Sequence, residues 1–305
     1  MIGLPIQKSV MVTGASSGIG RACAIRLAHQ GFRVFAGVRK QEDGMKLELA
    51  VGSNLFPVML DVTDQKSIAD VAGTVSTQLG SRGLDGLVNN AGIGFSGPLE
   101  YLPMEDLRAQ YEVNVFGQVA VTQAFLPLIR KAAGRIINIG SVGDRMAIPF
   151  GASLCSSKSA LASMTEALRM ELHPWGIHVC LIEPGSISTP AVGKVTAQAE
   201  RLFERLPAEA ERLYGSMFRS FLHSMAEREK QGSSPDVVAE IISKALTNRK
   251  PRTRYTAGKD SWLLTALPRL LPDRLLDFLR LRLFGLPTSF ASLAGRRPPQ
   301  LSSRL

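Results

Sequence analysis

Six short apolar runs alternate with helix-like stretches between Ser9 and about Ala191. Each run is continuously apolar, which is typical of strands that are buried on both faces of a parallel sheet. In chain order the runs are SVMVTG, FRVFAGVR, LFPVMLDVT, LDGLVNNAG, GRIINIGS and IHVCLIEPG. Strands and helices in regular succession require right-handed crossovers. The pattern therefore predicts an α/β fold built on a doubly wound parallel sheet.

The length of 305 residues suits a single α/β domain with added segments. We assign residues 1–260 to this domain and residues 261–305 to a C-terminal extension. Within the domain, residues 191–230 have amphipathic helical spacing, and we expect them to form one or two helices over a substrate pocket. Near the end of the domain, RTRYTAG predicts a last strand at the edge of the sheet.

Several helix signals are strong enough to place ends. The stretch TDQKSIADVAGTVSTQLG predicts a helix with Thr63 or Asp64 as its N-cap. The stretch that begins at Met104 and ends with LPLIRKA predicts one long helix. The stretch SSPDVVAEIISKALTNRK predicts a helix with Ser233 or Ser234 as its N-cap and proline in its first turn.

Positive charge is concentrated at the C-terminal end. The chain has a net charge of +10, and from Arg249 onward twelve lysines and arginines stand against three aspartates, a balance of +9. Residues 261–286 are apolar but interrupted by proline and arginine, and they lack the ~18 uncharged residues needed to cross a bilayer. Two roles stay open for this amphipathic extension: it lies on a membrane surface, or it covers the pocket or a partner subunit. We expect no nucleic-acid partner, because no aromatic residues interleave the arginines.

The three cysteines, Cys23, Cys155 and Cys180, match no disulfide or metal-ligand spacing. We therefore expect no metal site, and a reducing, cytoplasmic compartment with membrane association as an open addition. The first residues show no signal-peptide organisation, because they enter an apolar run and a glycine motif at once.

The stretch TGASSGIG lies between the first predicted strand and the first predicted helix. Gly14 allows a tight turn, Gly18 lets a diphosphate approach the backbone, and Gly20 lets helix and strand pack closely. The free N–H groups at the start of the helix attract phosphate. The motif in this context predicts a Rossmann-type dinucleotide site. Its predicted contact residues are Gly14, Ser16, Ser17, Gly18, Ile19 and Gly20.

The end of the second strand bears on the choice of nucleotide. An acid there would bind the ribose hydroxyls, but Val38 and Arg39 occupy the position. A guanidinium can grip a 2′-phosphate with two hydrogen bonds, so Arg39 favours NADP(H) over NAD(H). The alternative is that Arg39 only solvates the strand end. Asp61 and Val62 follow the third strand and are predicted to meet the adenine ring, with helix capping as the alternative for Asp61.

Four further motifs follow the glycine turn: NNAG at Asn89–Gly92, VNVFG around Asn114, INIGS ending at Ser141, and PGSIST at Pro184–Thr189. In this order the motifs resemble the short-chain dehydrogenase/reductase family from Ser9 to about Pro190, and more loosely to Gly258. The resemblance implies a nicotinamide cofactor and a homodimer or homotetramer formed by the helices that carry Asn114 and Lys158. It implies that Asn114 holds a water in a proton relay and that Ser141 orients the substrate carbonyl. It also implies that Lys158 holds the nicotinamide ribose. Further cofactor contacts implied by the resemblance are Asn90, Ala91, Gly92, Pro184, Gly185, Ile187 and Thr189.

The resemblance fails at one position. The tyrosine of the family's Tyr-x-x-x-Lys pair falls at Leu154, four residues before Lys158. In the family this tyrosine is the general acid, and proton transfer of this kind is worth roughly 10²–10⁴-fold in rate. Ser153 and Cys155 would point about 100° away on a helix. Asp144, close after Ser141, is expected near the mouth of the pocket.

Four interpretations of Leu154 stay open. The proton step can run through Lys158, directly or through a water that also bonds Ser141. The substrate can be one that needs no acid, such as an iminium or an activated double bond. The chain can be a non-catalytic NADP(H)-binding protein or sensor. Finally, Leu154 can be an engineered substitution in an otherwise ordinary member of the family.

We favour an NADP(H)-dependent oxidoreductase with an altered proton step. It would move a hydride between nicotinamide and a carbonyl, alcohol or imine. The apolar residues of the predicted cover indicate a lipophilic small-molecule substrate. These residues are Phe203, Tyr214, Met217, Phe218, Phe221 and Leu222.

Overall fold

The computed structural model describes residues 7–291 and 293 of the chain, so the outer ends of the predicted segments 1–260 and 261–305 lie outside the described residues. One seven-stranded sheet forms the centre, in the order β3-β2-β1-β4-β5-β6-β7. All neighbouring strands are parallel. The strands are β1 (Ser9–Val12), β2 (Arg33–Val38), β3 (Leu55–Met59), β4 (Gly86–Asn89), β5 (Arg135–Ile139), β6 (His178–Pro184) and β7 (Arg254–Ala257). The predicted α/β fold with a Rossmann-type doubly wound sheet is confirmed.

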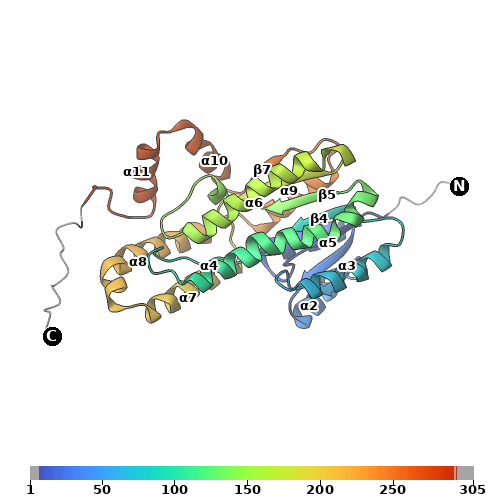
Figure 1. Cartoon of the computed structure of the whole chain (residues 1–305), viewed down its shortest axis with the longest axis horizontal. Helices are drawn as coiled ribbons and strands as arrows, with labels where there is room; N and C mark the ends of the chain where they lie inside the picture. The colour runs from blue at the N-terminus through green and yellow to red at the C-terminus, as the bar shows by residue number, and fades with distance from the viewer. Residues whose placement is uncertain (1–6, 292, 294–305) are drawn as a thin grey trace.

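Helices cover both faces of the sheet (Figure 1). Helices α1 and α9 pack against each other on one face, and α3 and α5 pack against each other on the other. The helices are α1 (Gly18–His29), α2 (Gln41–Val51), α3 (Gln65–Leu79), α4 (Met104–Tyr111), α5 (Gly117–Ala132), α6 (Ala152–Glu171), α7 (Pro190–Arg205), α8 (Ala208–Lys230), α9 (Pro235–Thr247), α10 (Ser261–Leu270) and α11 (Asp273–Leu283).

The side chains of the apolar strands are buried in two separate hydrophobic cores, one on each face of the sheet. Successive side chains of a strand point to opposite faces, so Val10 and Val12 enter the core beside α1 and α9, whereas Met11 enters the core beside α3 and α5. Phe35 of β2 also lies in the second core, between neighbours that enter the first. Strand side chains are buried on both faces of the sheet, which is the physical reason that the sequence runs are continuously apolar.

The predicted helix ends are resolved by their capping bonds. Asp64 accepts a hydrogen bond from the Lys66 backbone N–H at the start of α3. Ser234 accepts one from the Asp236 N–H at the start of α9, with Pro235 in the first turn. The long helix predicted from Met104 is continuous to Ala132, with a π-helical turn at Glu112–Phe116 between α4 and α5. The last strand, β7, lies at the edge of the sheet as predicted.

The predicted cover is a pair of helices, α7 and α8, which lie at the left end of the molecule in Figure 1. The C-terminal segment lies above them and packs on α8. Phe284 and Leu286 are buried against Phe218 and Phe221 in a third apolar cluster. The Ser220 hydroxyl donates a hydrogen bond to the Gly285 carbonyl at 3.2 Å. The described part of the extension therefore packs on α8, and its two predicted roles stay predictions.

Within the described residues, no helix combines the length and the apolarity that a membrane span requires.

A buried polar ladder joins the two central strands to the helices beside them. Asn89 of β4 donates to the Thr122 hydroxyl of α5 at 2.8 Å and to the Asn138 side-chain oxygen of β5 at 2.9 Å. Asn138 in turn donates to the Thr165 hydroxyl of α6 at 2.9 Å. This ladder fixes the helices that carry the candidate site relative to the sheet.

We expect Asn89→Ala to lower the free energy of unfolding by about 1–3 kcal/mol, because two buried polar partners would lose a hydrogen bond. Urea denaturation of the purified chain measures this value. The control is Asn248→Ala at the exposed end of α9, which should change stability by less than about 0.5 kcal/mol. Equal effects of the two substitutions would contradict the role given to the ladder.

Candidate active site

The glycine turn after β1 is shaped by close backbone contacts. Gly14 has a positive φ of 63°, and a Cβ there would lie 2.8 Å from the Cα of Ala91. The Asn90 side-chain amide donates to the Thr13 carbonyl at 2.9 Å and to the Gly14 carbonyl at 3.1 Å. A Cβ at Gly20 would overlap the Gly14 carbonyl. The turn thus rests rigidly on the segment that follows β4.

The start of α1 faces an open groove. Ser17 is the N-cap, but no side chain bonds the first helical N–H groups, so these donors are available to an anion. Gly18 has a φ of 54°, and a Cβ there would lie 3.4 Å from Thr189 on the other wall. Ile19 points into the core beside α1. A cavity of about 590 Å³ begins here, at Ser17 and Gly18, and runs along α1 past Arg26 to Pro235 at the start of α9. The cradle therefore fits a diphosphate.

Polar residues follow β2 and β3 at the same edge. Asp61 accepts hydrogen bonds from the Thr63 backbone N–H at 2.9 Å and from the Thr63 hydroxyl at 2.7 Å. The backbone bond from Thr63 is the main cause that holds the pKa of Asp61 below its usual range, and the charge of Arg39 adds to it. Arg39 is exposed, and Val62 is buried against Gly117. Asp61 forms a turn, and its alternative as a helix N-cap is excluded because Asp64 caps α3.

Asn114 occupies the π-helical turn Glu112–Phe116 and is fully buried. Its side-chain oxygen accepts from the Ile93 N–H at 2.9 Å, and its amide donates to the Ile93 carbonyl at 3.0 Å. The amide also donates to the Ser157 hydroxyl at 3.1 Å. Asn114 thereby joins the loop after β4 to α6, next to Lys158.

Lys158 points from α6 toward the carboxyl edge of the sheet. Its Nζ donates to the Ile139 carbonyl at 2.8 Å, and it lies 3.9 Å from the position of a Cβ at Gly92. Burial lowers the pKa of Lys158 to about 8, and the negative charge of Asp144 partly opposes this shift. The ammonium is therefore a better proton donor than an ordinary lysine.

Leu154 faces the same loop as Lys158, one helical turn earlier. Its Cδ2 lies 4.0 Å from the position of a Cβ at Gly94, and Val195 of α7 lies 3.1 Å from the same position. Leu154 is half-buried. The side chain at this position thus lies between the loop after β4 and the cover, and it presents only methyl groups there.

Ser141 follows β5 and caps the short turn Val142–Asp144. Its Oγ accepts a hydrogen bond from the Gly143 N–H at 3.0 Å. A hydroxyl that accepts in this way keeps its own proton for another acceptor. Ser141 can therefore donate a hydrogen bond to an oxygen bound at the site.

Ser153 and Cys155, two neighbours considered as substitutes for the tyrosine, are both buried. The Ser153 hydroxyl is buried and bonds the Gln110 side-chain oxygen at 2.8 Å. Cys155 is buried, and burial raises the pKa of its thiol. The expectation that Asp144 lies at the pocket mouth is wrong. Its side chain is fully buried and is held 2.9 Å from Arg254 of β7, because that guanidinium provides a partner inside the protein.

The loop after β6 carries the remaining predicted residues. Pro184 ends β6, and the Gly185 N–H donates to the Ala257 carbonyl at 2.9 Å. The Ile187 side chain is buried in the core, so only its backbone faces outward. Thr189 precedes α7 and reaches the glycine turn, as described above. The loop therefore closes the groove from the side opposite to α1.

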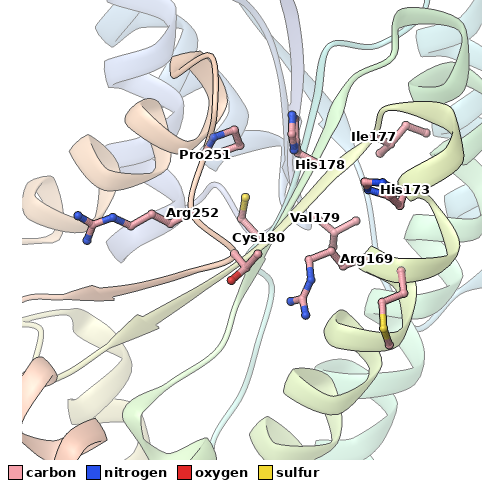
Figure 2. A pocket seen from close by; sticks show the side chains of 10 residues that line it. Arg169, His173, Ile177, His178, Val179, Cys180, Pro251 and Arg252 are labelled. Atoms are coloured by element: carbon pink, nitrogen blue, oxygen red, sulfur yellow. The ribbon is translucent and has the colours of Figure 1, made fainter.

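A second cavity, of about 290 Å³, lies at the opposite end of the sheet. Figure 2 shows Arg169 reaching toward it from α6, with His178 at the start of β6. None of the predicted site residues lines it. The candidate site is thus confined to the carboxyl edge.

Sequence reasoning did not find two features of this region. One is the wall formed by Gly94 and Val195 against Leu154. The other is a set of ion pairs around Arg254 beneath the edge. The only sequence signal for the second was an acid, Glu183, at the end of an otherwise apolar strand.

The sequence matches the family described as short chain dehydrogenase over residues 8–200. The chain belongs to this family. Human short-chain dehydrogenase/reductase family 9C member 7 is 35% identical over 292 residues, which cover 94% of this chain and 93% of the human protein. Mouse (Mus musculus) retinol dehydrogenase 5 is 36% identical, with 88% of this chain and 86% of that protein covered.

Solved structures of the family agree with the fold. A short-chain dehydrogenase from Streptomyces avermitilis has a TM-score of 0.72 and 30% identity, covering 92% of this chain and 96% of that chain. A short chain dehydrogenase from Burkholderia cenocepacia in complex with NADP has a TM-score of 0.67 and 27% identity, covering 91% and 99%. The chain is therefore classed with the nucleotide-binding oxidoreductases of this family, while the tyrosine position at Leu154 stays a prediction.

We expect Lys158 to titrate near pH 8, well below an exposed lysine. Cyanate modifies only the neutral amine, so the rate at Lys158 should rise with pH and level off above about pH 8. Lys66 is the internal control, because its ion pair with Asp70 raises its pKa. Peptide mass spectrometry measures both rates in one sample. A Lys158 rate that still rises in parallel with Lys66 at pH 10 would contradict the assignment.

Proposed function

We propose that the chain is an NADP(H)-dependent oxidoreductase that moves a hydride between nicotinamide and a carbonyl, alcohol or imine of a lipophilic small molecule. The observation that carries this proposal is the meeting of Asn114, Ser141 and Lys158 beside a glycine turn shaped for a diphosphate. Family membership and a relative in complex with NADP support it.

In this proposal each segment of the carboxyl edge holds one part of the cofactor, whose nicotinamide supplies or accepts the hydride. The turn at Gly14 and Gly18 and the N–H groups of α1 bind the diphosphate. Arg39 binds the 2′-phosphate as a two-pronged donor. The other proposed contacts are Ser16, Ser17, Ile19, Gly20, Asp61, Val62, Asn90, Ala91, Gly92, Lys158, Pro184, Gly185, Ile187 and Thr189.

The proton step falls to Lys158 and Ser141. With a pKa of about 8, the Lys158 ammonium is largely protonated at neutral pH and is matched to proton release there. The Ser141 hydroxyl donates a hydrogen bond to the substrate oxygen and stabilises negative charge on it. Leu154 removes the direct donor of the family, so the proton travels from Lys158, through a water where the distance requires one. An iminium substrate would need no proton at all.

The shape of the cover supports a lipophilic substrate. A groove of about 540 Å³ lies between α7 and α8. Phe203, Phe218 and Leu222 supply apolar surface in its lining, and charged residues such as Glu200 and Arg219 also line it. The rings of Phe203 and Phe218 stack with centroids 4.5 Å apart. Apolar grooves of this size suit drug-sized apolar molecules. One relative named above is a retinol dehydrogenase, which fits the same substrate class.

Two surfaces support the proposed partners. Phe116 and Met164, near the outer faces of α5 and α6, are 53% and 42% exposed, which fits a homodimer or homotetramer. On α10 and α11, Trp262 and Leu270 are 68% and 76% exposed near Arg269, which fits contact with an anionic membrane surface. A cytoplasmic location with such contact agrees with the free state of the three cysteines.

Restoring the general acid tests the function. We expect the parent chain to oxidise NADPH slowly with lipophilic carbonyls or imines, and Leu154→Tyr to accelerate ketone reduction by about 10²–10⁴-fold. Absorbance at the NADPH band measures both rates. Leu49→Tyr, at an exposed leucine of α2, is the matched control and should leave the rate unchanged.

The outcomes of this experiment separate the alternatives. NADPH binding without turnover in either the parent or Leu154→Tyr would favour the non-catalytic NADP(H) sensor. A large gain from Leu154→Tyr over an inert parent would favour an inactive variant, natural or engineered, of an ordinary dehydrogenase. Absence of binding to both NADPH and NADH would overturn the proposal.

The nucleotide preference is tested at Arg39. We expect Arg39→Gln to raise the dissociation constant for NADPH by about 10- to 100-fold, because a charge-assisted pair of hydrogen bonds is lost. Affinity for NADH should stay the same. Calorimetry measures both, with Lys46→Gln on the exposed surface of α2 as the control. Parallel losses for both nucleotides would assign Arg39 a merely structural role.

A further inference from the structure

Five charged side chains meet beneath the carboxyl edge of the sheet. They are Asp144, Arg145, Glu166, Glu183 and Arg254. Arg254 stands at the centre, with one terminal nitrogen 2.9 Å from Asp144 and 2.7 Å from Glu183. Its other terminal nitrogen lies 2.8 Å from Glu166. Arg145 reaches Glu183 at 2.6 Å.

The three acids belong to three different parts of the candidate site. Asp144 ends the short turn that begins with Ser141. Glu166 lies on α6, about two turns after Lys158. Glu183 lies on β6, one residue before Pro184, which ends the strand and leads into the loop Gly185–Thr189. A single guanidinium from β7 therefore ties together the segments that carry the serine, the lysine and one wall of the cofactor groove.

The contacts are buried enough to hold these segments firmly. The side chains of Asp144, Glu183 and Arg254 are 0%, 2% and 22% exposed. Glu166, at 47% exposed, closes the cluster toward solvent. A planar guanidinium can serve several carboxylates in fixed directions, whereas an ammonium provides one flexible point charge. The geometry of this cluster thus depends on arginine and not only on positive charge.

The cluster contains three carboxylic acids but only two arginines, so its negative charges outnumber its positive charges by one when all are ionised. Burial, together with the charge of Glu183, raises the pKa of Asp144 to about 6, although Arg254 opposes this shift. One Asp144 oxygen is buried without a hydrogen-bond partner among the described residues. Removing Arg254 would leave two buried carboxylates side by side with only Arg145 for support. The groups that act on this region are Arg145, Cys155, Lys158, Glu166, Glu183, Arg254 and, from α11, Arg280.

We infer that Arg254 is a positioning residue for the reaction: through Asp144, Glu166 and Glu183 it sets the mutual placement of Ser141, Lys158 and the loop that follows β6. The inference rests on the proposed function, because it concerns the groups that act on cofactor and substrate. Arg254 itself touches neither, since it lies beneath these groups with its guanidinium directed at the three acids.

Turnover and cofactor binding test the inference together. We expect Arg254→Lys to lower kcat on the order of 100-fold, because misplacement of reacting groups by about 1 Å has an effect of this size. The dissociation constant for NADPH should change by less than about threefold, because its phosphates bind at the other end of the groove. The enhancement of NADPH fluorescence on binding should fall, because the nicotinamide end is loosened. The control is Arg252→Lys, two residues away and exposed.

The dependence of stability on pH gives a readout that does not need turnover. An acid whose pKa is raised in the folded state loses stability as pH rises through that pKa. Without Arg254, the pKa of Asp144 should rise further above 6. The melting temperature of Arg254→Gln should therefore fall below that of the parent by more at pH 8 than at pH 5. A deficit that is equal at both pH values would overturn the inference.

These readouts keep the two proposals separate. A parent that binds NADPH but turns over no substrate would end the proposed oxidoreductase reaction, while the fluorescence and pH measurements would still decide the role of Arg254. Unchanged kcat and fluorescence in Arg254→Lys would overturn the inference even in a fully active enzyme. Should Arg254→Gln fail to fold, Arg254→Lys carries the pH measurement as well, with a smaller expected deficit because the charge is kept.

Discussion

The parallel packing of β1, β4, β5 and β6 is the constraint on which the rest of the molecule depends. Because these strands run in one direction, the segments that follow them all emerge at the same edge. The glycine turn, the loop with Gly92, Ser141 and the loop after Pro184 come together for this reason alone. Helix α6 adds Lys158, whose Nζ bonds the Ile139 carbonyl at the end of β5.

Polar contacts inside the protein refine this arrangement. Asn114 bonds both the loop after β4 and α6, and the ladder from Asn89 ties the same helices to the sheet. Beneath the edge, Arg254 connects the strand at the border of the sheet to the turn after Ser141. Each contact replaces water around a buried polar group, so each is stable only in one geometry. The apolar cores stabilise the fold, and these polar contacts fix the positions of the helices and loops relative to the sheet.

Leu154 is predicted to occupy the position of the family's tyrosine, four residues before Lys158. It keeps the place and direction of a side chain that faces Gly94 and the cover, but it has no proton to give. The polar groups around it are intact, and burial lowers the pKa of Lys158 next to it. In the proposed function, the glycine turn that would hold the cofactor lies at the same edge as this apolar side chain. The proposed function assigns the proton step to Lys158 for this reason.

The sequence by itself determined the strands, the glycine turn and the placement of Leu154 and Lys158 one helical turn apart, and it narrowed the N-caps of α3 and α9 to two candidates each. All of these follow from local spacing, from backbone conformation or from the order of elements in a parallel sheet. Tertiary structure alone decided that Asp144 is buried, that Phe284 and Leu286 close the cover, and that Arg254 joins three segments. Arg254 and Asp144 are 110 residues apart in the chain, and no local pattern signals a pairing over that distance. Such contacts exist only once the sheet has brought its strand ends together.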